Sequence, residues 1–171
     1  MKTFFDTNVL VYAVDPREGL KHAQADALVA QHMLGRSLVL STQVLQESYS
    51  VLTRKKQVAE PVALALVQTW AQESVVPASV DLVISALALC QRYRLSVWDA
   101  LIVQAALQAR CDILLTEDLQ AGMRFGDLEV VNPFVLGAHE AAPASSPKPA
   151  RRSTRPSTRT STRSSAKSAA R

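Results

Sequence analysis

The 171-residue sequence has few glycines and cysteines and no long hydrophobic run. Its five glycines are not clustered, which excludes a glycine-rich loop that cradles phosphates. Its two cysteines, Cys90 and Cys111, lack the spacing of a zinc site or a disulfide framework, so we expect reduced core residues. No apolar run approaches the roughly 18 residues that a membrane helix needs. We therefore expect a soluble, cytoplasmic protein with no membrane-bound part.

The motifs of several enzyme classes are also missing. No Gly-x-Ser-x-Gly elbow is present to support a Ser-His-Asp nucleophile. The three histidines, at positions 22, 32 and 139, have no spacing that suggests a shared zinc site. The chain starts directly with the strand-like Thr3–Phe5 and shows no basic lead followed by an apolar segment, so we expect no signal peptide. The remaining candidate chemistry is that of the acids.

Charge is distributed unevenly along the chain. The formal net charge is +4, but residues 138–171 carry eight bases against the single acid Glu140, a net +7 that leaves residues 1–137 at −3. The same 34 residues contain no aromatic or large aliphatic side chain, so they cannot bury enough apolar area to offset the entropy of ordering. We predict one compact domain over residues 1–137 and a disordered basic tail over residues 138–171.

Hydrophobic periodicity predicts short strands that alternate with longer helices. This alternation implies crossover connections and a parallel sheet covered by helices on both faces, an α/β fold. We expect strands at residues 3–5, 37–40, 75–76, 113–116 and 129–131, and helices at residues 18–33, 42–56, 61–73, 79–93 and 97–109. Three of these helices are expected to begin at a serine N-cap, namely Ser41, Ser79 and Ser96.

Two acids follow predicted strands. In parallel α/β sheets, sites form at the carboxyl ends of the strands, and Asp6 and Asp118 lie directly or within two residues after such ends. Each has a structural alternative, since Asp6 could cap a helix and Asp118 could be an ordinary loop acid. Thr116 is the expected hydroxyl partner of Asp118, because alternate residues of an extended segment face one side. Glu117, between them, is expected to be the solvated acid.

Two more acids lie within predicted helices. Glu47 shares a helix face with Val44 and Val51, where an ionised carboxylate is costly to bury unless it is paired. The alternative is a solvated glutamate at the edge of that face. Asp99 shares a face with apolar residues and lies three residues after Ser96, which is the spacing of a capping box. Asp99 could therefore cap the helix, bind a ligand, or do both.

Four segments in this order resemble those of the PIN-domain nucleases and, more narrowly, the VapC-type toxins of bacterial toxin–antitoxin modules. The resemblance covers about residues 2–135, and it implies a PIN-like sandwich with a short central parallel sheet flanked by helices. The basic tail is not part of the family pattern. The four segments are Phe5-Asp6-Thr7-Asn8-Val9-Leu10, Glu47 within a helix, Trp98-Asp99-Ala100-Leu101-Ile102, and Leu115-Thr116-Glu117-Asp118-Leu119-Gln120.

The resemblance also implies a divalent metal, Mg²⁺ or Mn²⁺. Electrostatics agrees, because two carboxylates 4 Å apart repel by about 4 kcal/mol at an effective dielectric constant near 20, and a divalent cation removes that repulsion. Ligands that are all oxygen suit Mg²⁺ or Mn²⁺. The family resemblance implies that the supporting residues are Asn8 and Thr116 and that the catalytic metal ligands are Asp6, Glu47, Asp99 and Asp118.

The expected function is a metal-dependent endoribonuclease that hydrolyses RNA phosphodiester bonds, as the toxin of a toxin–antitoxin pair. Its expected partners are an RNA substrate, a cognate antitoxin and a second copy of the chain. Two alternatives stay open: an RNA-processing nuclease without an antitoxin, and a non-catalytic RNA-binding protein that uses the basic tail. The bases Arg54, Lys55 and Lys56 could contact phosphates, or they could simply stabilise the carboxyl end of a helix.

Overall fold

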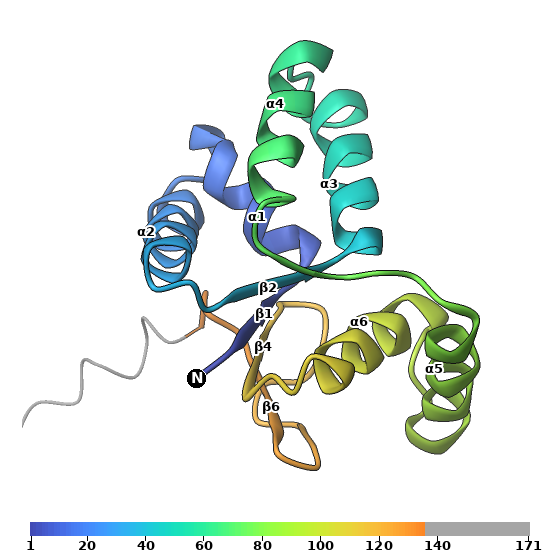
Figure 1. Ribbon diagram of the computed structural model, residues 1–171. Coiled ribbons are helices and arrows are strands. Elements are labelled where there is room, and N and C mark those ends of the chain that lie inside the picture. The colour runs from blue at the N-terminus through green and yellow to red at the C-terminus, as the bar shows by residue number, and fades with distance from the viewer. Residues whose placement is uncertain (136–171) are drawn as a thin grey trace, which may run out of the picture. The chain divides into compact units, whose positions relative to one another are not determined.

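The computed structural model describes residues 1–135, and the basic tail predicted over residues 138–171 lies outside this part. Within the described residues, one six-stranded sheet is flanked by six α-helices (Figure 1). The strands are β1 (Thr3–Phe5), β2 (Leu38–Ser41), β3 (Ser74–Val76), β4 (Ile113–Leu115), β5 (Arg124–Phe125) and β6 (Leu128–Val131). The helices are α1 (Thr7–Val14), α2 (Leu20–Leu34), α3 (Thr42–Arg54), α4 (Glu60–Trp70), α5 (Val80–Tyr93) and α6 (Val97–Gln108).

The sheet has the order β3-β2-β1-β4-β6-β5, and every neighbouring pair is parallel except β5 and β6. The predicted α/β fold with a parallel sheet is confirmed. The antiparallel strand β5 was not predicted, because two residues before a turn are too short to show an alternating pattern. Since β1 lies between β2 and β4, the segments that follow these three strands meet at one edge of the sheet. Phe5 pairs with Leu115, which brings the residues after β1 and β4 together.

Helix α1 occupies the apolar stretch to which sequence analysis assigned no structure. Asp6 is its N-cap and its side chain accepts a hydrogen bond from the Thr7 N–H, as the structural alternative for Asp6 anticipated. Asp15 is its C-cap, and the 3₁₀ turn Pro16–Glu18 follows it. The next helix therefore begins at Leu20 and not at residue 18. One short helix thus has an aspartate at each end.

The predicted helix caps are present at three sites. Ser41, Ser79 and Ser96 precede α3, α5 and α6, and each hydroxyl accepts a hydrogen bond from an N–H in the first turn. Capping by Ser41 matters most for the site, because it starts α3 directly after β2. The helix that carries Glu47 is thereby fixed to the same sheet edge as Asp6.

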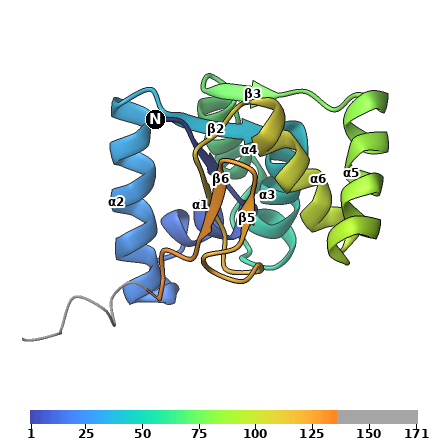
Figure 2. The same cartoon turned by 90° about the horizontal axis from the view of Figure 1, so that it is seen from below.

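The central strands are the most buried part of the described chain. Phe4, Phe5 and Leu114 are 0% exposed, as expected for parallel strands covered on both faces. In Figure 1, α3 and α4 stand side by side above the strands, and α5 and α6 lie side by side to the right of them. Figure 2 shows α2 and α5 on opposite sides of the strands.

Two expectations on membranes and cysteines can be compared with this fold. Among residues 1–135, no helix combines the length and apolar character that crossing a membrane requires. Cys111 is a free thiol in the core, as predicted, and burial raises its pKa to about 12. Cys90 is also free but only half-buried. Neither thiol lies among the acids at the sheet edge.

Candidate functional site

Asp6 lies at the carboxyl edge of the sheet, where its backbone and both carboxylate oxygens are held. Its N–H donates to the carbonyl oxygen of Leu115 at 3.0 Å, which continues the β1–β4 ladder by one residue. Its Oδ1 accepts the Thr7 N–H at 2.6 Å, and its Oδ2 accepts the Thr116 hydroxyl at 2.6 Å. The residue is 8% exposed. Strand pairing and helix capping together therefore fix this buried carboxylate.

Asn8 and Thr116 join Asp6 to Asp118. The Asn8 Nδ2 donates to Asp118 Oδ2 at 3.0 Å and lies 3.4 Å from both Asp6 Oδ2 and Thr116 Oγ1. The backbone N–H of Asp118 donates to Thr116 Oγ1 at 3.1 Å. The two residues that the resemblance marked as supporting thus lie between the two acids that follow strands.

Glu47 projects from α3 toward the beginning of α1. Its Oε2 accepts the Thr7 hydroxyl at 2.9 Å, and its Oε1 accepts the Gln43 Nε2 at 2.9 Å. Glu47 is half-buried and bonded at both oxygens, so the alternative of a freely solvated glutamate does not hold. Sequence analysis assigned no contact to Thr7 or Gln43. The contact between Gln43 and Glu47 could have been predicted from the sequence, because residues four apart on a helix are neighbours.

Asp99 occupies a different position from the other three acids. It is half-buried in the first turn of α6, and its Oδ2 accepts the Ser96 hydroxyl at 2.7 Å while its N–H donates to Ser96 Oγ at 3.1 Å. The capping interaction proposed for Asp99 is therefore present, although its carboxylate contacts the hydroxyl and not a backbone amide. Gln43 Nε2 lies 3.5 Å from the Trp98 carbonyl oxygen, so the start of α6 adjoins α3.

Asp6, Glu47 and Asp118 line one cavity of about 360 Å³, and Asp99 is not among its lining residues. The structure thus brings together three of the four predicted acids. Several other charged or aromatic groups line the same cavity. These groups are Tyr12, Glu18, Lys55, Lys56 and Glu117.

The pKa of Asp6 reports the electrostatic state of this cavity. The pKa of Asp6 is raised to about 6, chiefly by burial and in addition by the negative charges of Asp118 and Glu47, although hydrogen bonds from Thr116 and Thr7 act to lower it. An acid so shifted destabilises the folded state when it ionises. The cavity therefore favours the arrival of a cation.

The oxygen atoms present fit a hydrated divalent ion. Among the described residues, Asn8 Oδ1 is buried and accepts no hydrogen bond, so it is an unused oxygen ligand beside two carboxylates. Within the same residues, no three His, Cys, Asp or Glu side chains converge closely enough to enclose a metal. Mg²⁺ does not need such an enclosure, because it keeps several waters and commonly binds one or two carboxylates. The donor set therefore fits an ion that retains part of its water shell.

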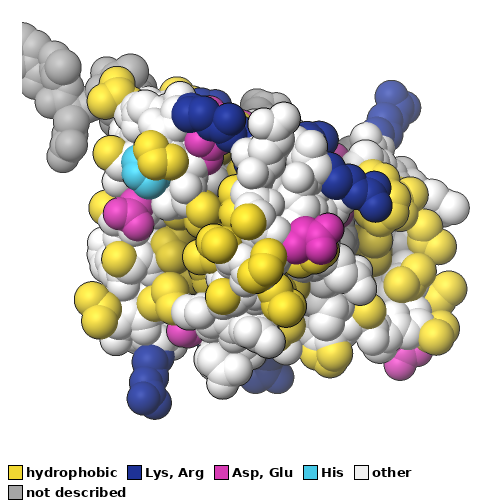
Figure 3. Space-filling model, turned by 90° about the horizontal axis from the view of Figure 1, so that it is seen from above, with side chains coloured by type: hydrophobic (Ala, Val, Ile, Leu, Met, Phe, Trp, Pro, Cys, Tyr) yellow, Lys and Arg dark blue, Asp and Glu magenta, His cyan; other side chains and the backbone are white. Residues whose placement is uncertain are grey.

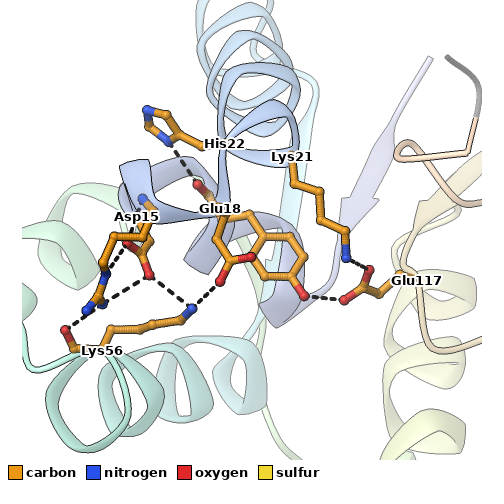
Figure 4. Close-up of polar contacts among 8 residues, drawn as sticks. Asp15, Glu18, Lys21, His22, Lys56 and Glu117 are labelled. Atoms are coloured by element: carbon orange, nitrogen blue, oxygen red, sulfur yellow. Dashed lines mark hydrogen bonds and ion pairs between the residues drawn. The ribbon is translucent and has the colours of Figure 1, made fainter.

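Figure 4 shows a set of charged side chains that meet around Asp15 and Lys56. Asp15 is 6% exposed and contacts Arg17 Nε at 2.8 Å and Lys56 Nζ at 3.0 Å. Hydrogen bonds from Arg17 and Lys56 hold the pKa of Asp15 well below its usual range. Lys56 also pairs with Glu18. These contacts explain how an aspartate can be buried at the end of α1 while it stays ionised.

Glu117 is a further correction, because it was expected to be the solvated member of the Glu117–Asp118 pair. Its side chain is 22% exposed and pairs with Lys21 Nζ at 2.6 Å, and it accepts the Tyr12 hydroxyl, whereas Asp118 is exposed. Burial acts to raise the pKa of Glu117, but contacts with Lys21 and Tyr12 outweigh it and lower the pKa. Sequence alone could not find these partners, which lie more than 90 positions away.

Several known proteins have a fold similar to that of this chain. The toxin VapC20 of Mycobacterium tuberculosis, described as cleaving the sarcin-ricin loop, is similar in fold (TM-score 0.55, 18% identity, 66% of this chain and 87% of that one). A toxin–antitoxin complex from Klebsiella pneumoniae (TM-score 0.57, 23% identity, 77% and 98%) and DNA-bound VapBC from Salmonella typhimurium (0.55, 18%, 76% and 96%) are also similar. No curated protein sequence matches the chain. The family model described as "PIN domain" matches residues 3–122, and the chain therefore belongs to the PIN domain family.

Proposed function

We propose that this protein is an endoribonuclease that depends on Mg²⁺ or Mn²⁺. One observation carries the proposal: Asp6 is a buried acid whose pKa is raised to about 6, it shares a cavity with the acids Glu47 and Asp118, and no base among residues 1–135 forms an ion pair with it. Strongly shifted pKa values of this kind cluster at functional sites. Membership of the PIN family supports the same assignment, because nuclease activity is what the family resemblance implies.

Asp6 and Asp118 are the proposed principal metal ligands, with Glu47 acting directly or through water. A bound divalent ion supplies an activated water for in-line attack at phosphorus and stabilises charge on the phosphate oxygens. Thr116 and Asn8 orient the two carboxylates through the contacts described above. Asp99 is the proposed fourth ligand, since among the described residues its Oδ1 accepts no hydrogen bond and is free to take that role.

RNA must approach an acidic body, since residues 1–137 carry a net charge of −3. Lys55 lines the cavity, and no acid among residues 1–135 pairs with it, so we assign it a phosphate contact. Lys56 is already paired with Asp15 and Glu18, so we assign it no phosphate contact. We propose residues 1–137 as the nuclease domain and assign the basic tail, residues 138–171, a salt-dependent and sequence-independent contribution to RNA affinity.

We propose further that this nuclease is the cytoplasmic toxin of a toxin–antitoxin pair. The likeness of its fold to proteins described as VapC or VapBC supports this narrower assignment and an antitoxin as partner. Expression of the gene alone should arrest bacterial growth, and co-expression with a small neighbouring gene should restore it. An RNA-processing nuclease without an antitoxin would instead be tolerated when expressed alone.

An exposed apolar face on α5 and α6 supports a homodimer. On the face drawn in Figure 3, hydrophobic side chains gather in the middle and again toward the edge where α5 lies in Figure 1. Antiparallel pairing of two α5 helices about a twofold axis would set Asp81 of one copy opposite Arg92 of the other, so the face is complementary to itself in charge. The face consists of Val80, Val83, Ile84, Leu87, Val97 and Trp98.

Three measurements test these proposals. RNA cleavage with Mg²⁺ or Mn²⁺ should be lost on chelation and in Asp6→Asn and Asp99→Asn, and undiminished cleavage in both variants would overturn the proposed site. Deletion of residues 138–171 should preserve cleavage at saturating RNA and weaken binding more at low salt than at high salt. Light scattering should show a dimer that Ile84→Glu converts to a monomer.

A further inference from the structure

Two side chains from different helices hold Glu117 beside the acidic cavity (Figure 4). Tyr12 in α1 donates its hydroxyl to Glu117 Oε1, and Lys21 in α2 donates from Nζ to Oε2 at 2.6 Å. The Lys21 Nζ also lies 4.8 Å from the centroid of the Tyr12 ring. We call these three residues the Glu117 anchor. It ties the segment after β4 to both α1 and α2.

Asp118, the next residue, has few contacts of its own. It is exposed, and its polar contacts within the described chain are the one from Asn8 to Oδ2 and the one from its N–H to Thr116. The segment from residue 116 to residue 123 forms no helix or strand that would fix it. Because consecutive Cα atoms are about 3.8 Å apart, whatever holds Glu117 also limits where Asp118 can place its carboxylate.

We infer that the Glu117 anchor positions Asp118 in the metal site. Tyr12, Lys21 and Glu117 are thus positioning residues that act through the neighbouring aspartate and need not touch the ion. The inference rests on the proposed role of Asp118 as a metal ligand. Loss of a residue that orients a metal ligand typically weakens metal binding about 10- to 100-fold.

The other ion pair beside Tyr12 offers a matched control. Lys56 pairs with Asp15 and Glu18, and its Nζ lies 5.9 Å from the same aromatic ring. Both lysines therefore join separate segments of the chain through carboxylates next to Tyr12, but neither Asp15 nor Glu18 adjoins a proposed ligand. If the Glu117 anchor merely stabilised the fold, Lys21→Met and Lys56→Met would behave alike.

The sign of the effect separates positioning from simple electrostatics. Removal of the Lys21 charge makes the cavity more negative, which by Coulomb attraction alone would tighten the binding of a cation. Loss of positioning predicts weaker binding instead. Tyr12→Phe removes the hydroxyl contact to Glu117 without any change of charge. Glu117→Gln is less informative, because the loss of a negative charge and the loss of positioning act in the same direction.

The test is calorimetric titration of the full-length protein with Mn²⁺, together with thermal unfolding in the absence of metal. We expect Tyr12→Phe and Lys21→Met to weaken Mn²⁺ binding about tenfold and Lys21→Arg and Lys56→Met to change it by less than about twofold. Asp118→Asn should weaken it too, and the double variant with Lys21→Met should bind no more weakly than Asp118→Asn alone. That lack of additivity would show that Lys21 acts through Asp118.

Each contrary result has a distinct meaning. If Asp118→Asn weakens Mn²⁺ binding but Tyr12→Phe and Lys21→Met bind it as tightly as the unmodified protein, the inference is overturned and the metal site stands. If Lys56→Met weakens binding as much as Lys21→Met does, the contribution is structural and the inference is overturned as well. If Asp118→Asn has no effect, the proposed ligand role of Asp118 is wrong and the inference falls with it.

Discussion

The two ends of α1 carry buried aspartates in opposite electrostatic surroundings. Asp6 is 8% exposed and Asp15 is 6% exposed, so burial hardly distinguishes them. Their pKa values nevertheless move in opposite directions, with that of Asp6 raised to about 6 and that of Asp15 lowered. At Asp6 burial is the main cause, and the negative charges of Asp118 and Glu47 add to it. At Asp15 hydrogen bonds from Arg17 and Lys56 outweigh the effect of burial.

This difference shows what distinguishes a site from a structural ion pair. Removing a carboxylate from water costs free energy at both ends of α1, and at Asp15 the protein's own cations offset that cost. At Asp6 the described chain supplies hydrogen bonds but no cation. The unmatched charge at Asp6, and not its burial, is what indicates a ligand that comes from outside the chain.

The largest expected effect is on RNA cleavage. Asp6→Asn keeps the shape of the side chain but removes the charge that a metal needs, so we expect cleavage to fall at least about a hundredfold. Asp15→Asn, at the other end of the same helix, should change cleavage by less than about threefold, because Asp15 is matched by bases and does not line the cavity. Single-turnover rates at saturating Mg²⁺ would test both, and equal losses would invalidate the distinction between the two aspartates.

Stabilisation of the protein by a bound metal should depend on the aspartate at one end of α1 and not on the one at the other end. Ligand that binds only the folded protein raises the free energy of unfolding by about 2.7 kcal/mol at one hundred times its dissociation constant. We expect this gain from Mn²⁺ in the unmodified protein and in Asp15→Asn, but not in Asp6→Asn. Thermal unfolding with and without Mn²⁺ would measure it. Equal stabilisation of Asp6→Asn would place the ion elsewhere.

The pH dependence of stability should reveal both aspartates in the metal-free protein. The folded-state pKa of Asp6 is raised, so its stabilising effect is complete below pH 3.8 and is lost as the pH rises through about 6. The folded-state pKa of Asp15 is lowered, so its effect is present above its ordinary pKa of 3.8 and is lost as the pH falls below that value. The two windows therefore lie on opposite sides of pH 3.8.

Differences in Tm between each variant and the unmodified protein would isolate these windows. Asp6→Asn should raise Tm above about pH 6 and leave it unchanged near pH 4. Asp15→Asn should lower Tm by a few degrees at neutral pH, with the loss disappearing in acid. Parallel pH curves for the two variants would contradict the assignment of opposite shifts.

The fold was largely predictable because its pattern is local. Strand β1, the alternation of short strands with helices, and the caps Ser41, Ser79 and Ser96 all follow from neighbouring residues. Helix α1 was not predicted, since six apolar residues in a row fit a strand or a buried helix equally well. Strand β5 was missed because it consists of two residues that are stabilised by their pairing with β6.

The candidate site divides in the same way. Asp6 and Asp118 could be placed together because the ends of parallel strands meet, and that rule needs no side-chain detail. The partners of Glu117 could not be found, because Tyr12 and Lys21 contact it only through the tertiary fold. The same reason hid the burial of Asp15, whose partner Lys56 lies at the end of α3. Sequence thus indicates which acids follow strands, whereas the positions of the bases decide which acids are matched.

The smallest expected effect concerns two adjacent lysines, and it extends the comparison from acids to bases. Lys55 lines the cavity without an acidic partner among residues 1–135, whereas Lys56 is held by Asp15 and Glu18. Lys55→Met should therefore raise KM for RNA a few-fold and lower the slope of log affinity against log salt concentration by about 1, with kcat unchanged. Lys56→Met should leave that slope unchanged and lower Tm instead, because the charge that it removes is used within the fold.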